Sequence, residues 1–220
     1  MSGATLRAYE IIISEIANGR LAGNSRLKEA ELADLTGVSR TPVREALRLL
    51  ETDGFVQTNP NTGAHVAVWS DEDLSEITDL RALLESFGAG LAAAKICEAE
   101  LWELEELACR MEQVVEDGKP NFLSVLSTLN KDFHLAVVGA TANRRLKSSI
   151  QAVIQGALVF RKFSVFSESQ IQRSLQHHRE IIAALKSGDS EWASSIMRNH
   201  ILAGRSADRI LEQSRNNGSC

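Results

Sequence analysis

The sequence is poor in aromatic residues and in cysteine, and it has no long apolar run. Each shortage excludes a class of protein. Three cysteines, odd in number and far apart, argue against a disulfide framework and for reduced thiols, and Cys97 and Cys109 fall within helical patterns as expected core residues. No apolar run is long enough to cross a bilayer, and residues 1–5 lack a signal-peptide pattern. We therefore expect a cytoplasmic protein with no membrane partner.

Positive charge is also not in excess. The formal net charge is −5, and residues 1–69 carry 7 Lys+Arg against 8 Asp+Glu, so a nucleic-acid binder would have to concentrate its positive charge locally. Apolar residues make up 44% of the chain and aromatic residues only 5%, while Ala and Leu are abundant. This composition predicts a mainly α-helical globular protein with one large domain or two small ones.

A tight turn leads into an arginine-bearing helix at residues 37–51. Gly37 supplies the turn, Ser39 is expected to cap the helix through its hydroxyl, and Pro42 lies where its missing N–H costs nothing. The predicted buried stripe of this helix consists of Val43, Ala46, Leu47 and Leu50. A second stripe at i, i+4 and i+8 consists of Arg40, Arg44 and Arg48. Such a stripe is either a solvated charged face or a set of contacts to DNA in the major groove.

The segments around this helix predict a winged helix-turn-helix over residues 1–69. A helix at 5–17 ends at a glycine, and a short helix at 29–35 precedes the Gly37 turn. Two predicted strands, 55–58 and 64–68, flank a turn cluster. A hairpin directly after a helix-turn-helix is a wing, whose tip can reach the minor groove or the phosphates. His65 lies in this wing and is either exposed or in contact with DNA.

From residue 69 onward the pattern is helical throughout. Ser70 is the expected N-cap of a helix that runs through Leu80, Leu83, Leu84, Phe87, Leu91 and Ala94. Further helices are predicted at 98–117, 120–140, 143–164, 167–187 and 189–213. The predicted fold class is therefore mainly α: a winged helix-turn-helix with a small β-hairpin, a six-helix antiparallel bundle over 70–213, and a flexible tail over 214–220.

Three histidines lie on the apolar stripes of three separate predicted helices: His134, His178 and His200. His177 falls off its stripe, whereas Asn130 lies on the stripe of His134, one turn earlier. A buried imidazole costs free energy without a partner, so the three are either satisfied core residues or share an ion or an anion. Neutral imidazoles suit zinc, nickel, copper or iron(II). The sequence has no His-Glu-x-x-His string and no evident general base, so catalysis is not indicated.

Residues 5–68 resemble the winged helix-turn-helix of the GntR family of bacterial transcription regulators. The resemblance rests on Leu27, Glu29, Leu32-Ala33, the string Gly-Val-Ser-Arg-Thr-Pro-Val-Arg-Glu-Ala-Leu at 37–47, Leu50, Gly54-Phe55 and Gly63. It implies contacts to double-stranded operator DNA by Arg40, Thr41, Arg44 and the wing tip at Gly63. The predicted DNA-binding set is completed by Ser39, Arg48 and His65. Ala30 departs from the pattern, because some members have a DNA-contacting arginine there.

Residues 70–212 resemble the ligand-binding domain of the FadR subfamily, and six helices favour its VanR-like branch. The resemblance rests on Arg81…Leu84-Glu85, Asn130-x-x-Phe133-His134, His178-Arg179-x-Ile181 with Ala184-Leu185 and Gly188-Asp189, and Met197-x-x-His200. It implies a divalent metal, zinc or nickel, on His134, His178, His200 and the residue one turn before the first. That residue is usually acidic, so Asn130 predicts a weaker site. The resemblance also implies that Arg81 reaches the effector, although an ion pair with Glu85 at i+4 is the alternative.

These observations predict a homodimeric repressor that binds a palindromic operator and responds to a small organic acid. The effector site would comprise Arg81, Asn130 and the three histidines, because a metal and an arginine together form a carboxylate trap. One alternative is a metal-dependent helical-bundle enzyme that acts on a small organic acid and retains a vestigial DNA-binding domain. The other is a bundle that serves only for dimerisation, with its histidines satisfied by water.

Overall fold

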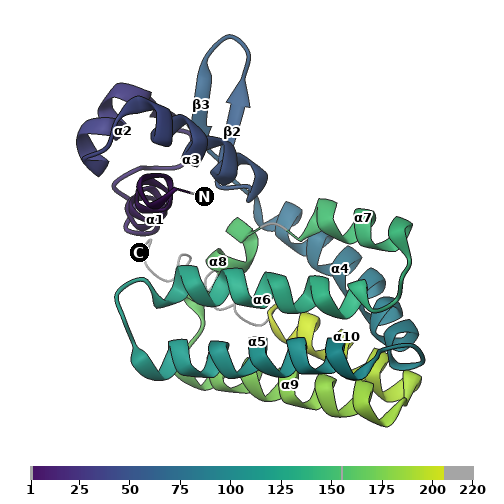
Figure 1. Ribbon diagram of the computed structural model, residues 1–220. Coiled ribbons are helices and arrows are strands. Elements are labelled where there is room, and N and C mark those ends of the chain that lie inside the picture. The colour runs from purple at the N-terminus through teal and green to yellow at the C-terminus, as the bar shows by residue number, and fades with distance from the viewer. Residues whose placement is uncertain (1, 155, 206–220) are drawn as a thin grey trace, which may run out of the picture. The chain divides into compact units, whose positions relative to one another are not determined.

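The computed structural model describes residues 2–154 and 156–205, and these form ten helices and three short strands (Figure 1). The chain divides into two compact units, and the division falls between Trp69 and Ser70. The predicted tail over 214–220 and the end of the helix predicted over 189–213 lie outside the described residues. None of the described helices is both long and apolar enough to cross a membrane.

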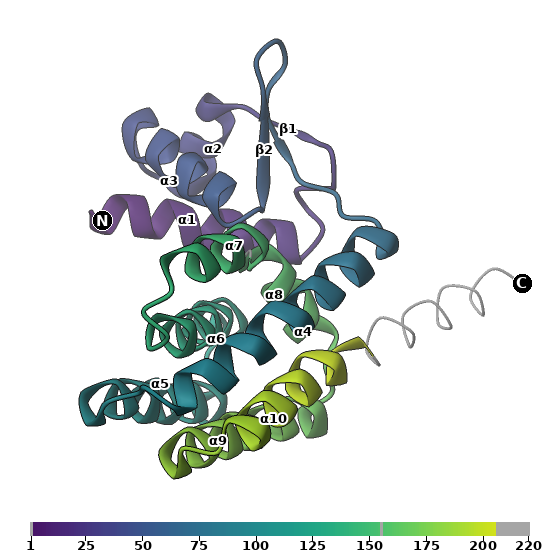
Figure 2. The ribbon, with the colours of Figure 1, turned by 90° about the vertical axis from the view of Figure 1, so that its right-hand side faces the viewer.

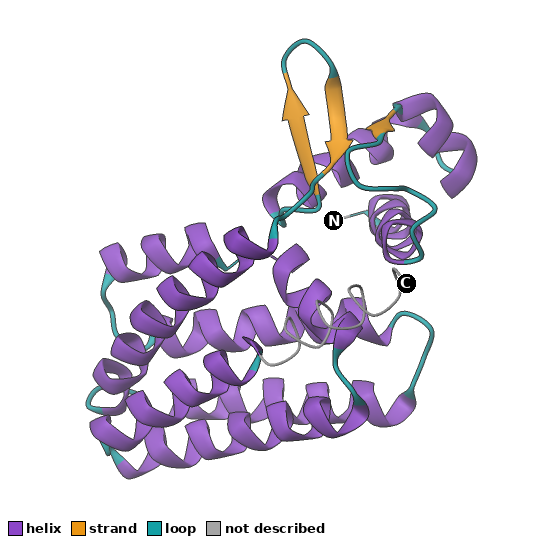
Figure 3. Ribbon diagram, turned by 180° about the vertical axis from the view of Figure 1, so that it is seen from behind, coloured by secondary structure: helices purple, strands orange, loops and turns teal. Residues whose placement is uncertain are grey.

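The first unit is a three-helix winged helix-turn-helix, as predicted. Its elements are α1 (Gly3–Ala17), β1 (Arg26–Leu27), α2 (Glu29–Thr36), α3 (Arg40–Thr52), β2 (Val56–Asn59) and β3 (Gly63–Val66). The hairpin of β2 and β3 stands out in Figure 3, with Val56 opposite Val66. The sheet has the order β1-β3-β2, so β1 adds an antiparallel third strand to the hairpin.

The predicted buried stripe of α3 is confirmed. Its four members, Val43, Ala46, Leu47 and Leu50, are all buried, while its three arginines are exposed. Two hydrogen bonds tie the middle of α3 and its C-cap residue to α1: Thr5 Oγ1 donates to Glu45 Oε2 at 2.7 Å, and Tyr9 Oη donates to Asp53 Oδ2 at 2.7 Å. Burial and hydrogen bonding to α1 therefore fix which face of α3 points outward.

The turn between α2 and α3 depends on Gly37, whose φ of +67° is in the left-handed region that glycine tolerates best. Ser39 is the N-cap residue of α3, but its side chain accepts no capping hydrogen bond. The predicted capping role of its hydroxyl is therefore wrong. Ser39 has the extended backbone conformation of an N-cap residue, and α3 begins after it without a side-chain capping hydrogen bond.

The second unit is an all-helical bundle. Its elements are α4 (Asp71–Ala93), α5 (Glu98–Asp117), α6 (Phe122–Gly139), α7 (Arg144–Val153), α8 (Gly156–Val165), α9 (Glu168–Ser187) and α10 (Ser190–Ala203). Helix α4 packs along α10, and α5 packs against α6 and α9 (Figure 2). The described bundle thus has seven helices, and the predicted count of six is corrected.

The extra helix arises because the segment predicted as one helix over 143–164 forms two, α7 and α8. Ile154 leaves the helical conformation with a ψ of 92°. Its side chain is buried in a small cluster with Val138, Leu146 and Ile150. The residue at the end of α7 packs against another helix, which is a tertiary contact. Helical periodicity in the sequence does not predict such a contact.

Helix α4 also buries a different face from the one its leucines indicate. Leu80, Leu83 and Phe87 are 42%, 64% and 56% exposed, whereas its alanines Ala82, Ala89 and Ala92 are fully buried. The reason is close packing, since a Cβ on Gly90 would lie 3.1 Å from the carbonyl oxygen of Ser190 at the start of α10. Small side chains therefore face the neighbouring helices at these positions. Leu80, Leu83 and Phe87 point outward, whereas Leu74 is buried and Leu84 and Leu91 are partly buried.

The two cysteines predicted as core residues are both exposed. Cys97 is the N-cap residue of α5, and the Cys109 sulfur lies 3.2 Å from Nη2 of Arg179. The core consists instead of large aliphatic and aromatic side chains, including Leu104, Met111, Leu126, Phe133, Ile181, Leu185, Met197 and Ile201. The buried histidines on α6, α9 and α10 lie among these residues.

Candidate functional site

A groove of about 480 Å³ lies between α3 and the strands of the first unit. Four basic and two acidic side chains line it: Arg26, Lys28, Arg44, Arg48, Glu29 and Glu51. Gly63 at the wing also lines it, whereas Ser39, Arg40 and Thr41 are exposed around the start of α3. Of the predicted DNA-binding residues, Arg44, Arg48 and Gly63 therefore line one groove, and the lining of this groove is net positive.

Arg44 is held in this groove by Glu29 of α2. Its Nε donates a hydrogen bond to Oε1 of Glu29 and its Nη2 donates one to Oε2, both at 2.7 Å. The guanidinium and the carboxylate therefore form a bidentate pair. The hydrogen bonds from Arg44 lower the pKa of Glu29. Both side chains are partly exposed, so the pair contributes little to stability, but it presents the guanidinium in a defined orientation.

The wing places Gly63 and His65 beside β1. Gly63 has a φ of +84°, and a Cβ there would lie 4.0 Å from the guanidinium of Arg26. His65 pairs with Arg26 across the sheet, is half-buried, and has its Nδ1 3.0 Å from the Gly63 carbonyl oxygen. Arg26 and Lys28 thus belong to the basic lining although the sequence reasoning missed them, because the pairing of β1 with β3 is long-range.

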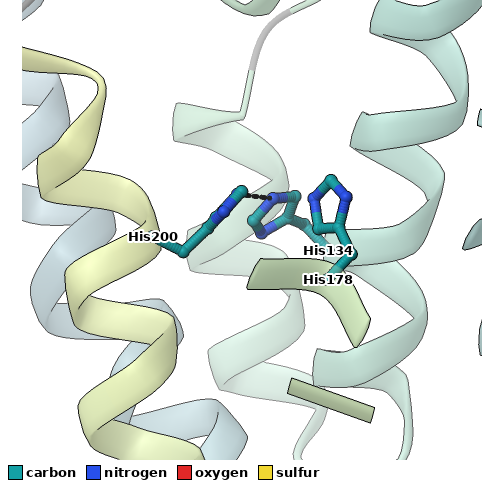
Figure 4. Close-up of side chains that lie close together, drawn as sticks. All are labelled: His134, His178 and His200. Carbon is teal, nitrogen blue, oxygen red and sulfur yellow. Dashed lines mark hydrogen bonds between the residues drawn. The ribbon is translucent and has the colours of Figure 1, made fainter. Parts of the chain in front are cut away.

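The second candidate site is a cluster of three buried histidines in the bundle (Figure 4). His134 on α6, His178 on α9 and His200 on α10 are 0%, 1% and 3% exposed. One ligating nitrogen of each lies within 4.8 Å of the others, and the three could hold a metal ion. The Nε2 atoms of His134 and His200 are 3.2 Å apart and form a hydrogen bond, the dashed line in Figure 4. This separation is also close to the ~3.3 Å expected for two nitrogens on a tetrahedral zinc with bonds of about 2.0–2.1 Å.

The nitrogens of this cluster fit a metal chemically as well as geometrically. Both ring nitrogens of His178 and Nδ1 of His200 are buried without a hydrogen-bond partner among the described residues. Burial lowers the pKa of all three imidazoles, and neighbouring positive charges lower it further for His178 and His200. Neutral imidazoles with unshared nitrogens are the form that binds a divalent metal.

Glu85 of α4 adds a carboxylate to the cluster. It is fully buried, and its Oε2 lies 2.5 Å from Nδ1 of His134, without the alignment of an ideal hydrogen bond. Its Oε1 accepts a hydrogen bond from Nε of Arg81 at 2.7 Å. Burial alone would raise the pKa of Glu85, but the charge of Arg81 and the contact with His134 outweigh it and bring the pKa to about 2. The group is therefore an anion beside His134.

A carboxylate at Nδ1 favours the tautomer that keeps a proton there and leaves Nε2 as the ligating atom. The sequence indicates Glu85 only as an ion-pair partner for Arg81 and does not reveal its contact with His134. No local signal could have revealed that contact, because α4 and α6 are remote in the sequence. The alternative reading of Arg81, an i+4 ion pair with Glu85, is what the structure shows. Asn130 is 4% exposed and lies one turn before His134 on α6.

A small pocket adjoins the histidine cluster at His200. It is lined by Lys162, Phe166, Gln170, Arg173, Ser174, His177, His200, Ala203 and Gly204. The ring of His177, which the periodicity placed off the apolar stripe, is half-buried with its centroid 5.7 Å from that of His200. Lys162 and Arg173 were not predicted as site residues, because they lie on different helices with no shared motif.

A winged helix-turn-helix with a basic groove, joined to a helical bundle with a buried polar cluster, defines a class of ligand-responsive DNA-binding regulators. Comparison with known families agrees: residues 4–66 match the bacterial regulatory proteins of the gntR family, and residues 76–203 match the FCD domain. The chain belongs to the GntR family of transcriptional regulators, with a C-terminal FCD domain that binds effectors. Members of this family are regulators and not enzymes, so the enzyme alternative is set aside.

Relatives are similar over nearly the whole chain. A probable D-xylose utilization operon transcriptional repressor of Paenarthrobacter nicotinovorans is 32% identical over 88% of this chain and 84% of that protein. The transcriptional repressor GlaR of Escherichia coli is 25% identical over 92% of this chain and 94% of its own. The solved structure of E. coli McbR/YncC superposes with a TM-score of 0.67 at 25% identity, covering 98% of this chain and 100% of the other. Repressors therefore occur among the relatives.

Proposed function

We propose that this regulator is a homodimeric repressor that binds a palindromic operator and is controlled by a small organic acid at a metal in its bundle. The observation that carries the proposal is the convergence of three buried, neutral histidines whose nitrogens include several without partners. Such a cluster is costly unless something binds to it. A repressor of this kind acts in the cytoplasm, where its operator is.

The first unit would read one half of the operator. Helix α3 would enter the major groove, with Arg44 and Arg48 near base edges and phosphates and Ser39, Arg40 and Thr41 at the leading end of the helix. The wing would approach the neighbouring backbone with Gly63 and His65, and Arg26 lies beside it. The net positive lining of the groove supports this assignment, because the chain as a whole is acidic.

A homodimer is supported by the outward face of α4. Leu80, Leu83 and Phe87 are spaced three and four residues apart, so they lie on one side of the helix, and all are exposed. A contiguous apolar stripe of this kind is typical of an interaction surface. A second copy of the chain is the partner that a two-fold operator requires.

The metal site would use His134, His178 and His200, and Asn130 is the candidate fourth ligand from α6. A divalent metal, zinc or nickel, would supply a positive centre to which a carboxylate can bind. Glu85 would hold His134 in the ligating tautomer, and Arg81 would neutralise Glu85. The amide of Asn130 brings no negative charge, so the site would keep more of its positive charge for an anionic effector.

The assignment to the VanR-like branch is part of the proposal, although the count of seven helices in the described bundle removes one argument for it.

Two measurements test the proposal. Electrophoretic mobility shift with the promoter region of the protein's own operon should show specific retardation, and a cognate organic acid should reverse it when zinc is present. Metal analysis of protein purified without a histidine tag should give about one ion per protomer. Retardation equal to that of an unrelated duplex would reject the operator assignment. A metal content near zero that stays so after incubation with zinc or nickel would reject the metal site and favour histidines satisfied by water.

A further inference from the structure

The four basic side chains that line the groove of the first unit differ in their partners. Lys28 and Arg44 each form an ion pair with a glutamate of α2 at 2.7 Å. The side chains of Arg26 and Arg48 make no hydrogen bond and no ion pair with any residue that the structure describes. An anion that binds to either guanidinium therefore competes with no ion pair among the described residues.

The backbone of β1 fixes where Arg26 emerges from the fold. β1 lies beside the hairpin (Figure 2) and pairs with β3, so that Arg26 lies opposite His65. Leu27 is 5% exposed and belongs to the core, whereas Arg26 is exposed. Successive side chains of a strand point to opposite faces, so burial of Leu27 directs Arg26 outward. The position of Arg26 is therefore set by the pairing of a sheet.

The guanidinium of Arg26 reaches the end of the wing. Asn59 and Gly63 are the last pair of residues before the turn of the hairpin. A Cβ on Gly63 would lie 4.0 Å from both Nε and Nη2 of Arg26, so the guanidinium lies beside the bare backbone of that glycine. This cation is thus on the strand side of the groove, while Arg44 and Arg48 are on the side of α3.

The placement of these cations on two sides of the groove fits the shape of DNA. When α3 lies in the major groove and the wing approaches the minor groove, the sugar–phosphate backbone that separates the two grooves lies between α3 and the wing. The groove of about 480 Å³ between α3 and the strands is the space available to that backbone. A cation on the strand side of this groove is therefore directed at a phosphate and not at the edge of a base.

We propose that Arg26 binds a phosphate of the operator backbone and anchors the wing side of the first unit on DNA. The inference rests on the proposed placement of α3 and the wing on DNA, and it adds a contact from an element outside the helix-turn-helix and the hairpin. A guanidinium can donate two parallel hydrogen bonds to phosphate oxygens. Because a phosphate contact carries no sequence information, Arg26 contributes affinity and register and no base preference.

Three variants test this assignment. Arg26→Gln removes the charge and keeps a polar side chain, and Arg26→Lys keeps the charge but replaces the guanidinium. Arg20→Gln is the matched control, because Arg20 is in the same unit, its side chain is 66% exposed, and it is not among the described residues that line the groove. Circular dichroism and thermal unfolding establish that each variant is folded.

Fluorescence anisotropy measures the affinity of each full-length variant for two duplexes over a range of potassium chloride concentrations. One duplex is selected by the parent protein from a pool of random sequences, and the other is its scrambled version. We expect Arg26→Gln to weaken binding to both duplexes by about tenfold at low salt, because a charge-assisted hydrogen bond is lost. The slope of the logarithm of the binding constant against the logarithm of salt concentration should become shallower by about 0.9 for each phosphate contact removed. Arg26→Lys should keep most of the slope, and Arg20→Gln should change neither affinity nor slope.

Neutral methylphosphonate linkages, placed one at a time in the selected duplex, locate the contact. A linkage at the phosphate that Arg26 binds should weaken binding of the parent protein. The same linkage should have little further effect on Arg26→Gln, because the contact with that phosphate is already lost.

The outcomes separate this inference from the proposed function. If Arg26→Gln binds both duplexes with the affinity and the salt slope of the parent protein, the inference is wrong and the proposed operator binding stands. If the variant loses affinity for the selected duplex alone, Arg26 reads a base and the phosphate assignment is overturned. A loss of affinity for both duplexes with an unchanged slope would show a merely structural role and also overturn it. If the parent protein binds neither the pool nor the scrambled duplex, the proposed function and the inference both fail.

Discussion

Two arginines show how strongly the surroundings of a residue decide its role. Arg44 and Arg81 each pair with a glutamate through a hydrogen bond of 2.7 Å from Nε. The Arg44 side chain is 57% exposed, so a phosphate or a guanine edge can replace Glu29 as its partner. The Arg81 side chain is 8% exposed and faces a fully buried carboxylate, so its pair belongs to the core. The same chemical group is therefore accessible to a binding partner in one place and neutralises a buried charge in the other.

Replacing Arg44 tests its role in reading DNA. We expect Arg44→Ala to weaken specific operator binding by about 1–3 kcal/mol, or about 5- to 150-fold, since a bidentate contact is lost. Arg44→Lys should keep binding to an unrelated duplex but lose most of the preference for the operator, because an ammonium lacks the planar fork. Fluorescence anisotropy at one fixed salt concentration measures both. Arg110→Ala, an exposed arginine on α5, is the control, and an unchanged operator preference in both Arg44 variants would contradict the assignment.

Replacing Glu85 tests its role beside His134. We expect Glu85→Gln to weaken zinc binding by about 10- to 100-fold through loss of the orienting carboxylate. It should also lower the free energy of unfolding by about 3 kcal/mol, because Arg81 is left buried and unpaired. Chelator competition measures the zinc affinity, and urea denaturation measures the stability.

A double variant separates these two effects. Arg81→Met with Glu85→Leu replaces the buried pair by apolar groups and should recover much of the stability while zinc binding stays weak. Glu112→Gln breaks a partly exposed pair with Arg179 and should cost less than about 1 kcal/mol with zinc binding intact. Zinc affinity that recovers along with stability in the double variant would show that Glu85 acts only through folding.

At the scale of the element, α4 has two faces that differ in composition and burial. Its alanines and Gly90 pack closely against neighbouring helices, and the same buried face carries Arg81 and Glu85 toward the histidine cluster. Its opposite face presents Leu80, Leu83 and Phe87 outward. A single helix thus borders both the proposed metal site and the proposed dimer surface, so a shift of α4 on ligand binding would reach the partner subunit directly.

A charge on the outward face of α4 tests the dimer. Leu83→Arg places a guanidinium in the middle of the apolar stripe, so we expect the dimer dissociation constant to rise by about tenfold or more. Sedimentation velocity over a range of concentrations measures this. Trp102→Arg changes a side chain that is 68% exposed on α5 and should leave the association unchanged. A Leu83→Arg protein that sediments like the parent would place the dimer interface elsewhere.

At the scale of the whole molecule, the buried histidines make stability depend on pH. Their pKa values are lower in the folded protein than the ordinary value, so below about pH 6.5 the unfolded chain binds protons that the folded protein does not. Stability should therefore fall as the pH falls, by at most about 4 kcal/mol per pH unit for three such groups. Glu85, with a pKa of about 2, stays ionised throughout this range and adds a loss only at lower pH.

Urea denaturation of chelator-treated protein at several values between pH 8 and pH 5.5 measures this dependence. Zinc-loaded protein is the comparison, because a bound metal adds stability at neutral pH and is itself lost as protons compete for the imidazoles. We expect the zinc-loaded curve to lie above the metal-free curve at pH 8 and to approach it near pH 5.5. A metal-free protein of constant stability over this range would contradict the lowered pKa values.

The sequence by itself determined those features that repeat along one helix. The spacing of Val43, Ala46, Leu47 and Leu50 predicted the buried face of α3, and the arginines between them were correctly placed outside. In the same way the stripes of α6, α9 and α10 placed His134, His178 and His200 inward. A helical period of 3.6 residues states which face of a helix is apolar, and for these helices that was enough.

Tertiary structure decided everything that depends on which elements meet. It split the helix predicted over 143–164 at the buried Ile154, turned Leu80, Leu83 and Phe87 of α4 outward, and paired β1 with β3. It also brought three histidines within 4.8 Å of one another and set Glu85 against His134. Helical periodicity predicts on which side of its helix a residue lies, but it does not predict which other helix or strand packs against that side. The chemistry of the cluster follows from the packing of α4, α6, α9 and α10, and a single-helix pattern does not contain that packing.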